Sequence, residues 1–119
     1  GNKLPKIFNV NWFRRDAEGN FVWPGFGQNM RVLEWIIDRC EGRADAVNTP
    51  IGLVPTYEQL NWSGLDFTKD QFETVTKQDK DQWIKELESH TELFTKLGAR
   101  LPQALRDRQS ALLDAVKSA

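Results

Sequence analysis

The stretch that decides the fold is NWFRRDAEGNFVWPGFGQNMRVLEW, from Asn11 to Trp35. It mixes aromatic rings with arginines, a proline and glycines, whereas a stretch that builds a core is usually aliphatic. A loop rich in glycine exposes the rings that it carries, and exposed rings suit a flat ligand such as a nucleotide base. The rings are Phe8 just before the stretch, and Trp12, Phe13, Phe21, Trp23, Phe26 and Trp35 within it.

The first part of this region predicts a β-hairpin. Lys6–Phe13 carries β-branched and aromatic residues in imperfect alternation, which is typical of a strand. A turn is expected at Asp16–Gly19, after which Asn20–Trp23 returns as a short second strand. Phe13 and Phe21 should then face each other across the hairpin.

A helix is expected directly after the glycine run. Asn29 is predicted to cap a helix over Met30–Glu41, and Gly42 to end it in the left-handed conformation. Apolar residues recur there at helical spacing, so we expect their stripe to be buried, with Cys40 as a small core residue. The stripe comprises Met30, Leu33, Ile37 and Cys40, widened by Ile36.

The second half of the chain is expected to be mostly helical. The proline-bound segment Thr49–Pro55 predicts an extended edge or a loop, and Thr56–Leu60 a helical turn. Thr68 and Gln71 have the spacing of a capping box, which predicts that a helix begins there. The accompanying hydrophobic staple would be Phe67 with Phe72.

Two longer helices follow in the prediction. One begins at Asp79 and stops at Gly98, and the other has Pro102 in its first turn. His90 lies on an apolar stripe and is interpreted as a partly buried structural residue rather than a catalyst. The predicted fold class is α+β: residues 1–66 form an aromatic hairpin and loop packed on a helix, and residues 67–119 form a helical tail.

Composition restricts the possible functions. The 119 residues fit one domain, and 16 Lys+Arg against 17 Asp+Glu disfavour a general nucleic-acid binder. The sequence has no membrane-spanning apolar run and no signal-peptide pattern, and a lone cysteine favours a reducing, cytoplasmic compartment. One His and one Cys do not make a Cys/His zinc site, and no G-x-x-x-x-G-K-[ST] motif occurs, so we expect no catalytic and no metal-binding residue in these 119 positions.

The rings of the opening stretch fit either a hydrophobic core or a stacking surface. Phe26 favours the stacking surface, because a ring between Gly25 and Gly27 is poorly placed for a rigid core. Trp12 and Trp35 lie on regular predicted elements and stay core candidates. If the side-chain oxygen of Asn29 caps the helix, its amide hydrogens are still free to donate to a ligand.

Four motifs follow one another along the chain: L-P-K-I-F-x-V-N-W-F-R-R-D at Leu4–Asp16, F-x-W-P-G-F-G-x-N at Phe21–Asn29, R-V-L-E-W at Arg31–Trp35 and T-P-I-G at Thr49–Gly52. In this order and at this spacing they resemble GTP-dependent phosphoenolpyruvate carboxykinase. The resemblance covers the whole chain and weakens after about Gly64, where only helical character and length match. Because the chain begins at Gly1 and its only methionine is Met30, it is interpreted as a piece of something longer. The resemblance implies that this piece is the carboxyl-terminal part of such an enzyme.

The resemblance implies an enzyme of gluconeogenesis that converts oxaloacetate and GTP to phosphoenolpyruvate, GDP and carbon dioxide with manganese or magnesium. It implies that Phe13, Phe21 and Phe26 hold the guanine base, with Asn29 at the base edge and Trp12 alongside. An Asn amide can donate to guanine O6, whereas adenine carries an amino group there.

The same resemblance implies that the phosphate loop, the metal ligands and the groups that bind oxaloacetate or phosphoenolpyruvate lie outside this chain. We therefore expect it to be one piece of a larger α/β nucleotide-binding domain, to need the rest of the parent enzyme, and to be inactive alone.

Two other functions stay open. One is a non-enzymatic module that stacks single-stranded RNA on the same rings with help from Arg14 and Arg15, which the net charge of −1 disfavours. The other is a helical protein-interaction module in which all the rings are core. Near-complete protection of the five tryptophans from quenching would favour that module. The main hypothesis includes neither a nucleic-acid partner nor a membrane.

Overall fold

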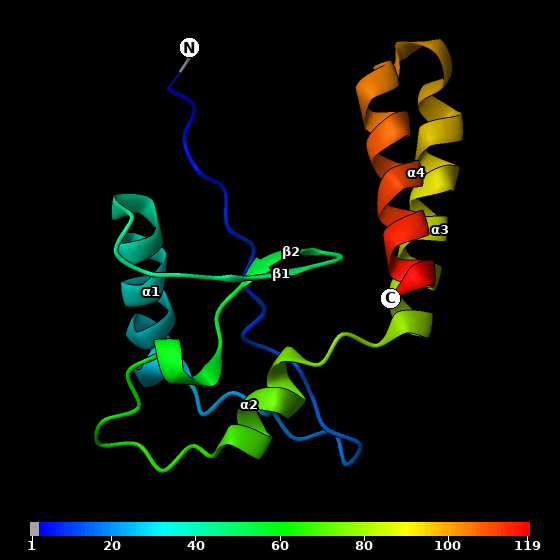
Figure 1. Ribbon diagram of the computed structural model, residues 1–119. Coiled ribbons are helices and arrows are strands. Elements are labelled where there is room, and N and C mark those ends of the chain that lie inside the picture. Colours follow the sequence, from blue (N-terminus) through cyan, green and yellow to red (C-terminus); the bar gives the residue numbers. More distant parts are fainter. Residues whose placement is uncertain (1–2) are drawn as a thin grey trace. The chain divides into compact units, whose positions relative to one another are not determined.

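The computed structural model describes residues 3–119, which belong to two units (Figure 1). The first unit comprises the chain up to Val47 together with Leu53–Lys77, and the second comprises Asn48–Gly52 together with Gln78–Ala119. Within residues 3–119, no helix is both long enough and apolar enough to cross a membrane.

The predicted strand over Lys6–Phe13 is wrong. The chain from residue 3 to residue 11 has no regular secondary structure, and a single antiparallel bridge between Arg15 and Phe21 is all that remains of the expected hairpin. A strand needs a partner along its whole length, and the residues described here offer Lys6–Phe13 none. The predicted turn does form, with the Asp16 carboxylate accepting hydrogen bonds from the backbone N–H groups of Glu18 (3.0 Å) and Asn20 (2.8 Å).

The first long helix, α1 (Asn29–Glu41), follows directly on a short 3-10 helix, η1 (Phe26–Gln28). The prediction that Asn29 caps α1 is wrong, because the capping position is Gln28 and it makes no side-chain cap. Asn29 already lies inside the helical path, since its backbone N–H donates to the carbonyl of Phe26. Gly42 ends α1 in the left-handed conformation, at φ 75°, as predicted.

The buried face of α1 is not the predicted one. Trp35 is only 5% exposed, whereas Met30, Leu33 and Ile37 are 64%, 37% and 49% exposed, and Cys40 is also exposed. At helical spacing Trp35 lies opposite that aliphatic stripe, so a helix that buries the large ring leaves the stripe outside. Only Ile36, at the margin of the stripe, packs against the core.

The core of the first unit forms around Trp35, Leu60, Phe67 and Phe72. Trp62 anchors the connection between these residues, because its ring stacks on Phe67 at 5.0 Å between centroids. Two local predictions are confirmed here. A helical turn, η2 (Tyr57–Gln59), precedes Leu60, and α2 (Lys69–Thr76) begins with the Thr68–Gln71 capping box.

The strands of the structure lie in a segment where none was firmly expected. β1 (Val47–Thr49) and β2 (Gly52–Val54) pair as a two-stranded sheet, so the α+β class is right but the hairpin is a different one. The Thr49 hydroxyl donates to the carbonyl of Gly52 at 2.7 Å and closes the turn through Pro50 and Ile51.

The second unit contains α3 (Lys80–Leu97), η3 (Gly98–Arg100) and α4 (Gln103–Ser118). Figure 1 shows α3 and α4 packed along each other, and Gln109 of α4 donates to the Leu87 carbonyl of α3 at 2.8 Å. The predicted Asp79 cap and Gly98 stop are confirmed, whereas Pro102 is the cap of α4 rather than part of its first turn. His90 is half-buried, as expected, with its Nε2 3.4 Å from Glu86.

Candidate nucleotide-binding site

A tight turn at Asp16 brings Phe13 and Phe21 together. The backbone N–H of Asp16 donates to the carbonyl of Asn20 at 2.9 Å, and that of Val22 to the carbonyl of Arg14 at 3.0 Å. These bonds place the rings of Phe13 and Phe21 edge to face, 6.0 Å apart between centroids, which confirms the expected pair.

The ionised carboxylate of Asp16 stabilises the turn by accepting hydrogen bonds from it. Its hydrogen bond from the backbone N–H of Asn20 is the main reason that the pKa of Asp16 lies below the ordinary 3.8, with smaller contributions from the Asn20 side chain and the Glu18 backbone. Hydrogen bonds that a carboxylate accepts favour its charged form. The turn that brings Phe13 and Phe21 together therefore includes a carboxylate whose pKa is lowered by the hydrogen bonds that it accepts.

The two rings of this pair differ in how much of them a ligand can reach. Phe13 is 71% exposed and Phe21 53%. The guanidinium of Arg15 lies over the ring of Phe21, 4.1 Å from its centroid, while also donating to the carbonyl of Gly19. A cation already occupies one face of Phe21, so Phe13 is the more accessible stacking partner.

Phe26 is exposed, as expected for a ring in a glycine-rich loop. It is 91% exposed, and within residues 3–119 it makes no ring–ring contact. Gly25 before it has φ 112° and ψ 174°, a backbone conformation open essentially to glycine alone. Phe26 thus begins η1 with a free ring whose direction is set by Gly25, and no direct contact joins it to Phe13 or Phe21.

Asn29 and Trp23 form the polar part of the site. The indole N–H of Trp23 donates to the side-chain oxygen of Asn29 at 2.8 Å. Trp23 is 6% exposed, and the half-buried ring of Trp12 packs against it with 5.6 Å between the ring centroids. Trp23 was not among the predicted site residues. The sequence feature that could have identified Trp23 is its position six residues before Asn29, because an indole N–H can only donate and a side-chain amide offers it an acceptor.

The two arginines near the rings are both engaged within the first unit. Arg14 donates to the carbonyl of Val75 at 3.2 Å and to that of Lys77, while Arg15 covers Phe21. Neither guanidinium is a free phosphate contact of the kind that an RNA-stacking module needs. This weighs against the RNA alternative.

The described residues do not supply a metal site. No group of three or more His, Cys, Asp or Glu side chains in the described part of the chain is arranged to hold an ion. The manganese or magnesium that the resemblance implies therefore finds no ligand set among these residues.

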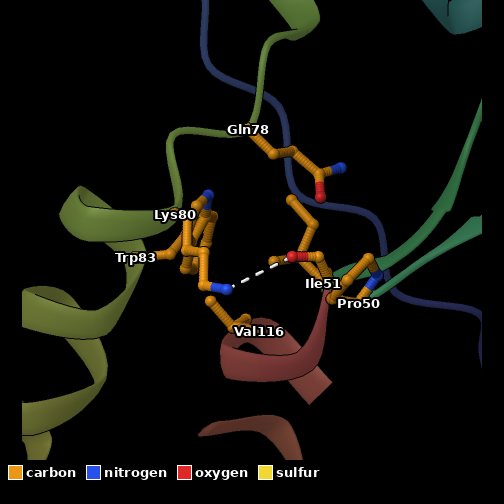
Figure 2. Close-up of a pocket in the computed structure, with 7 residues that line it drawn as sticks. Pro50, Ile51, Gln78, Lys80, Trp83 and Val116 are labelled. Carbon is orange, nitrogen blue, oxygen red and sulfur yellow. Dashed lines mark hydrogen bonds between the residues drawn. The ribbon is translucent and has the colours of Figure 1, made fainter. Parts of the chain in front are cut away.

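Two hollows in the surface are lined by residues other than the rings just described. One, in the second unit, has a volume of about 40 Å³ and is lined by seven residues, among them Pro50, Lys80 and Trp83 (Figure 2). It has room for little more than water, since ligand pockets usually measure about 300–1,000 Å³. The other is a wide depression of about 480 Å³ along α2, lined by polar residues including Asp70 and Glu73. Its carboxylates do not suit an anionic nucleotide.

Comparison with known proteins places the chain in one family. The family model described as "Phosphoenolpyruvate carboxykinase C-terminal P-loop domain" matches residues 1–115. A phosphoenolpyruvate carboxykinase [GTP] from Paenarthrobacter aurescens is 54% identical over 110 residues, which are 92% of this chain and 18% of the relative. A protein of the same name from Treponema pallidum (strain Nichols) is 51% identical over 110 residues, and one from Anaeromyxobacter sp. (strain K) is 50% identical over 115 residues. The chain spans 18–19% of the length of these relatives.

Proposed function

Because the chain belongs to the GTP-dependent phosphoenolpyruvate carboxykinase family, we propose that its first unit recognises the guanine base of GTP within a larger enzyme. That enzyme would convert oxaloacetate and GTP to phosphoenolpyruvate, GDP and carbon dioxide. The base lies far from the phosphoryl group that moves, so its binding energy serves to position the nucleotide. The chain alone is inactive in this proposal.

The observation that carries the proposal is the exposure of two rings, Phe13 and Phe26, that precede the hydrogen-bonded side-chain amide of Asn29 in the sequence. Phe13 and Phe26 are 71% and 91% exposed, so both rings offer aromatic surface on which a flat ligand can stack. In the proposed site they stack on the faces of the base. Phe21 supports Phe13 from the side, and Trp12 forms a wall next to Trp23.

The edge of the base is read by Asn29. Its oxygen already accepts from Trp23, so the group left to face a ligand is the amide nitrogen, which only donates. Guanine O6 accepts such a bond, whereas the adenine amino group does not. The arrangement thus suits guanine better than adenine.

The rest of the parent enzyme is the other partner in this proposal. The exposed aliphatic stripe of α1, formed by Met30, Leu33 and Ile37, is apolar surface of the kind that marks an interface. The matched region covers only 18% of the first relative named phosphoenolpyruvate carboxykinase [GTP], so that relative is more than five times as long. We propose that further parts of such a chain cover this stripe and carry the phosphate, metal and oxaloacetate sites.

The test is the substitution Phe26→Ala in the full-length polypeptide, with Ile7→Ala as the matched control. Ile7 is 92% exposed, nearly the same as Phe26, but it is not one of the proposed site residues. Stacking of a base on an aromatic ring is worth roughly 1–3 kcal/mol, so Phe26→Ala should raise the KM for GTP about 5- to 150-fold. Ile7→Ala should leave that KM unchanged. An unchanged KM for GTP in Phe26→Ala, with normal thermal stability, would contradict the proposal.

A further inference from the structure

An asparagine by itself does not distinguish guanine from adenine. Its side-chain amide has an acceptor oxygen and a donor nitrogen of nearly equal size, and rotation by half a turn exchanges them. One orientation donates to guanine O6, and the other accepts from the adenine amino group. A site that uses Asn29 to select guanine therefore needs a second group that holds the amide one way round.

We propose that Trp23 is this positioning residue, an inference that rests on the proposed guanine site. The indole N–H is a donor with no acceptor capacity, so the atom that it meets at 2.8 Å must be the oxygen of Asn29. The nitrogen of the amide then points away from Trp23. A half-turn of the amide would bring two N–H donors together and leave the indole without an acceptor.

Trp23 is held firmly enough to act in this way. It is 6% exposed, and its ring contacts Trp12 at 5.6 Å, Phe67 at 5.9 Å and Trp62 at 6.4 Å between centroids. These contacts come from different parts of the first unit, so they restrict rotation of the indole ring and keep its N–H directed at Asn29. An unsatisfied buried donor would disfavour the reversed amide by roughly 5- to 150-fold.

A backbone hydrogen bond fixes the position of Asn29 relative to Phe26. The N–H of Asn29 donates to the carbonyl of Phe26, so the edge-reading side chain and the exposed ring are joined by one turn of η1. Trp23 therefore fixes the orientation of a donor whose place relative to Phe26 is already set. Base selectivity would thus depend on a buried residue that need not touch the nucleotide.

The experiment is a double-mutant cycle in the full-length polypeptide, with kcat/KM measured for GTP, ITP and ATP. The variants are Trp23→Phe, Asn29→Ala and the combination of the two. Trp23→Phe keeps a ring but removes the N–H, so the GTP-to-ATP preference should fall roughly 2- to 12-fold, the worth of one neutral hydrogen bond. The GTP-to-ITP ratio should hold, because inosine keeps O6. With Asn29→Ala already present, Trp23→Phe should change the GTP-to-ATP ratio no further.

Two further variants separate positioning from packing. Replacement of Trp23 by β-(3-benzothienyl)alanine preserves the bicyclic shape while sulfur takes the place of N–H, and it should lower the preference as Trp23→Phe does even if the latter folds poorly. Trp62→Phe is the matched control, since its indole N–H donates to the Tyr57 carbonyl at 2.8 Å and its ring contacts Trp23. It should affect GTP, ITP and ATP equally.

The outcomes distinguish this inference from the proposal on which it rests. If Asn29→Ala leaves the GTP-to-ATP preference intact, Asn29 does not read the base and both ideas fail. If Asn29→Ala lowers the preference but the benzothienyl replacement does not, the guanine site stands and Trp23 has only a packing role. An equal loss from Trp23→Phe with and without Asn29→Ala also overturns the positioning role.

Discussion

The guanidinium of Arg14 donates to the backbone carbonyl of Val75, 61 positions away along the chain, at 3.2 Å. The same group also donates to the carbonyl of Lys77, so Arg14 satisfies two carbonyls at the end of α2. The last carbonyls of a helix have no partners within the helix, and a cation near them is favourable. This contact ties the residue next to Phe13 to the helical part of the first unit.

We predict that Arg14→Gln destabilises the protein by about 1–3 kcal/mol, because charged hydrogen bonds to otherwise unpaired carbonyls are lost. Arg14→Lys should recover part of the loss, since an ammonium keeps the charge but lacks the planar fork. Denaturant melts measure the effect. Arg108→Gln, the same change at an exposed position of α4, is the control and should stay within about 0.5 kcal/mol. Equal effects at the two positions would contradict the capping role of Arg14.

Gly25→Ala should destabilise the loop that carries Phe26. A Cβ at Gly25 meets no atom within 4 Å, so the cost comes from the backbone at φ 112° and amounts to about 1–3 kcal/mol. Gly27→Ala is the matched control, because that glycine also has open space around it and does not have a positive φ. Thermal melts should show a loss for Gly25→Ala only, and a loss of the same size for Gly27→Ala would show that the strain argument is wrong.

Asp16 should make the first unit sensitive to acid. Its pKa in the folded protein lies below 3.8, chiefly because of the hydrogen bond from the Asn20 backbone, so its stabilising effect is complete above 3.8 and is lost as the pH falls through the lowered value. Asp16→Asn keeps an acceptor but removes this titration, and its stability should fall less steeply than that of the wild type below about pH 4. Melts over this range provide the measurement. Glu18→Gln is the control in the same turn, because it leaves the Asp16 carboxylate and its backbone donors in place.

Ile37 tests whether other parts of a longer chain cover α1. It is 49% exposed in this structure, and a Ser at an exposed position should change stability by no more than about 0.5 kcal/mol. If the stripe is covered in the full-length polypeptide, Ile37→Ser there should instead cost about 2–5 kcal/mol. Chemical denaturation of the full-length polypeptide gives the answer, and a change near zero would mean that the stripe stays in solvent.

Local features of this fold could be predicted from the sequence, because the residues that decide them are neighbours. The Thr68–Gln71 capping box, the Gly42 and Gly98 stops and the Asp16 turn each depend on a few adjacent residues, and each forms as expected. The Phe13–Phe21 contact could be predicted as well, since the turn alone brings the two rings together.

The errors concern features that depend on distant partners. Lys6–Phe13 has the composition of a strand but no strand to pair with, whereas Val47–Val54 forms a hairpin despite its proline. The aliphatic spacing in α1 predicts the wrong buried face, because the large ring of Trp35 packs on a cluster that is contributed by residues 60–72. The orientation of Asn29 was beyond a prediction from spacing, because it depends on the direction of a single N–H in the core.

The burial of Trp23 bears on how the base preference of the proposed site could change in evolution. If the residue that orients the amide is also part of the aromatic core with Trp12, Trp62 and Phe67, a mutation that relaxes the base preference also loosens the fold. An evolutionary path toward ATP through Trp23 would then need compensating changes in that core before it could be tolerated. If Phe13 and Phe26 stack on the base as proposed, substitutions at these exposed positions carry no such penalty, so variation there should change affinity while the choice of base stays unchanged.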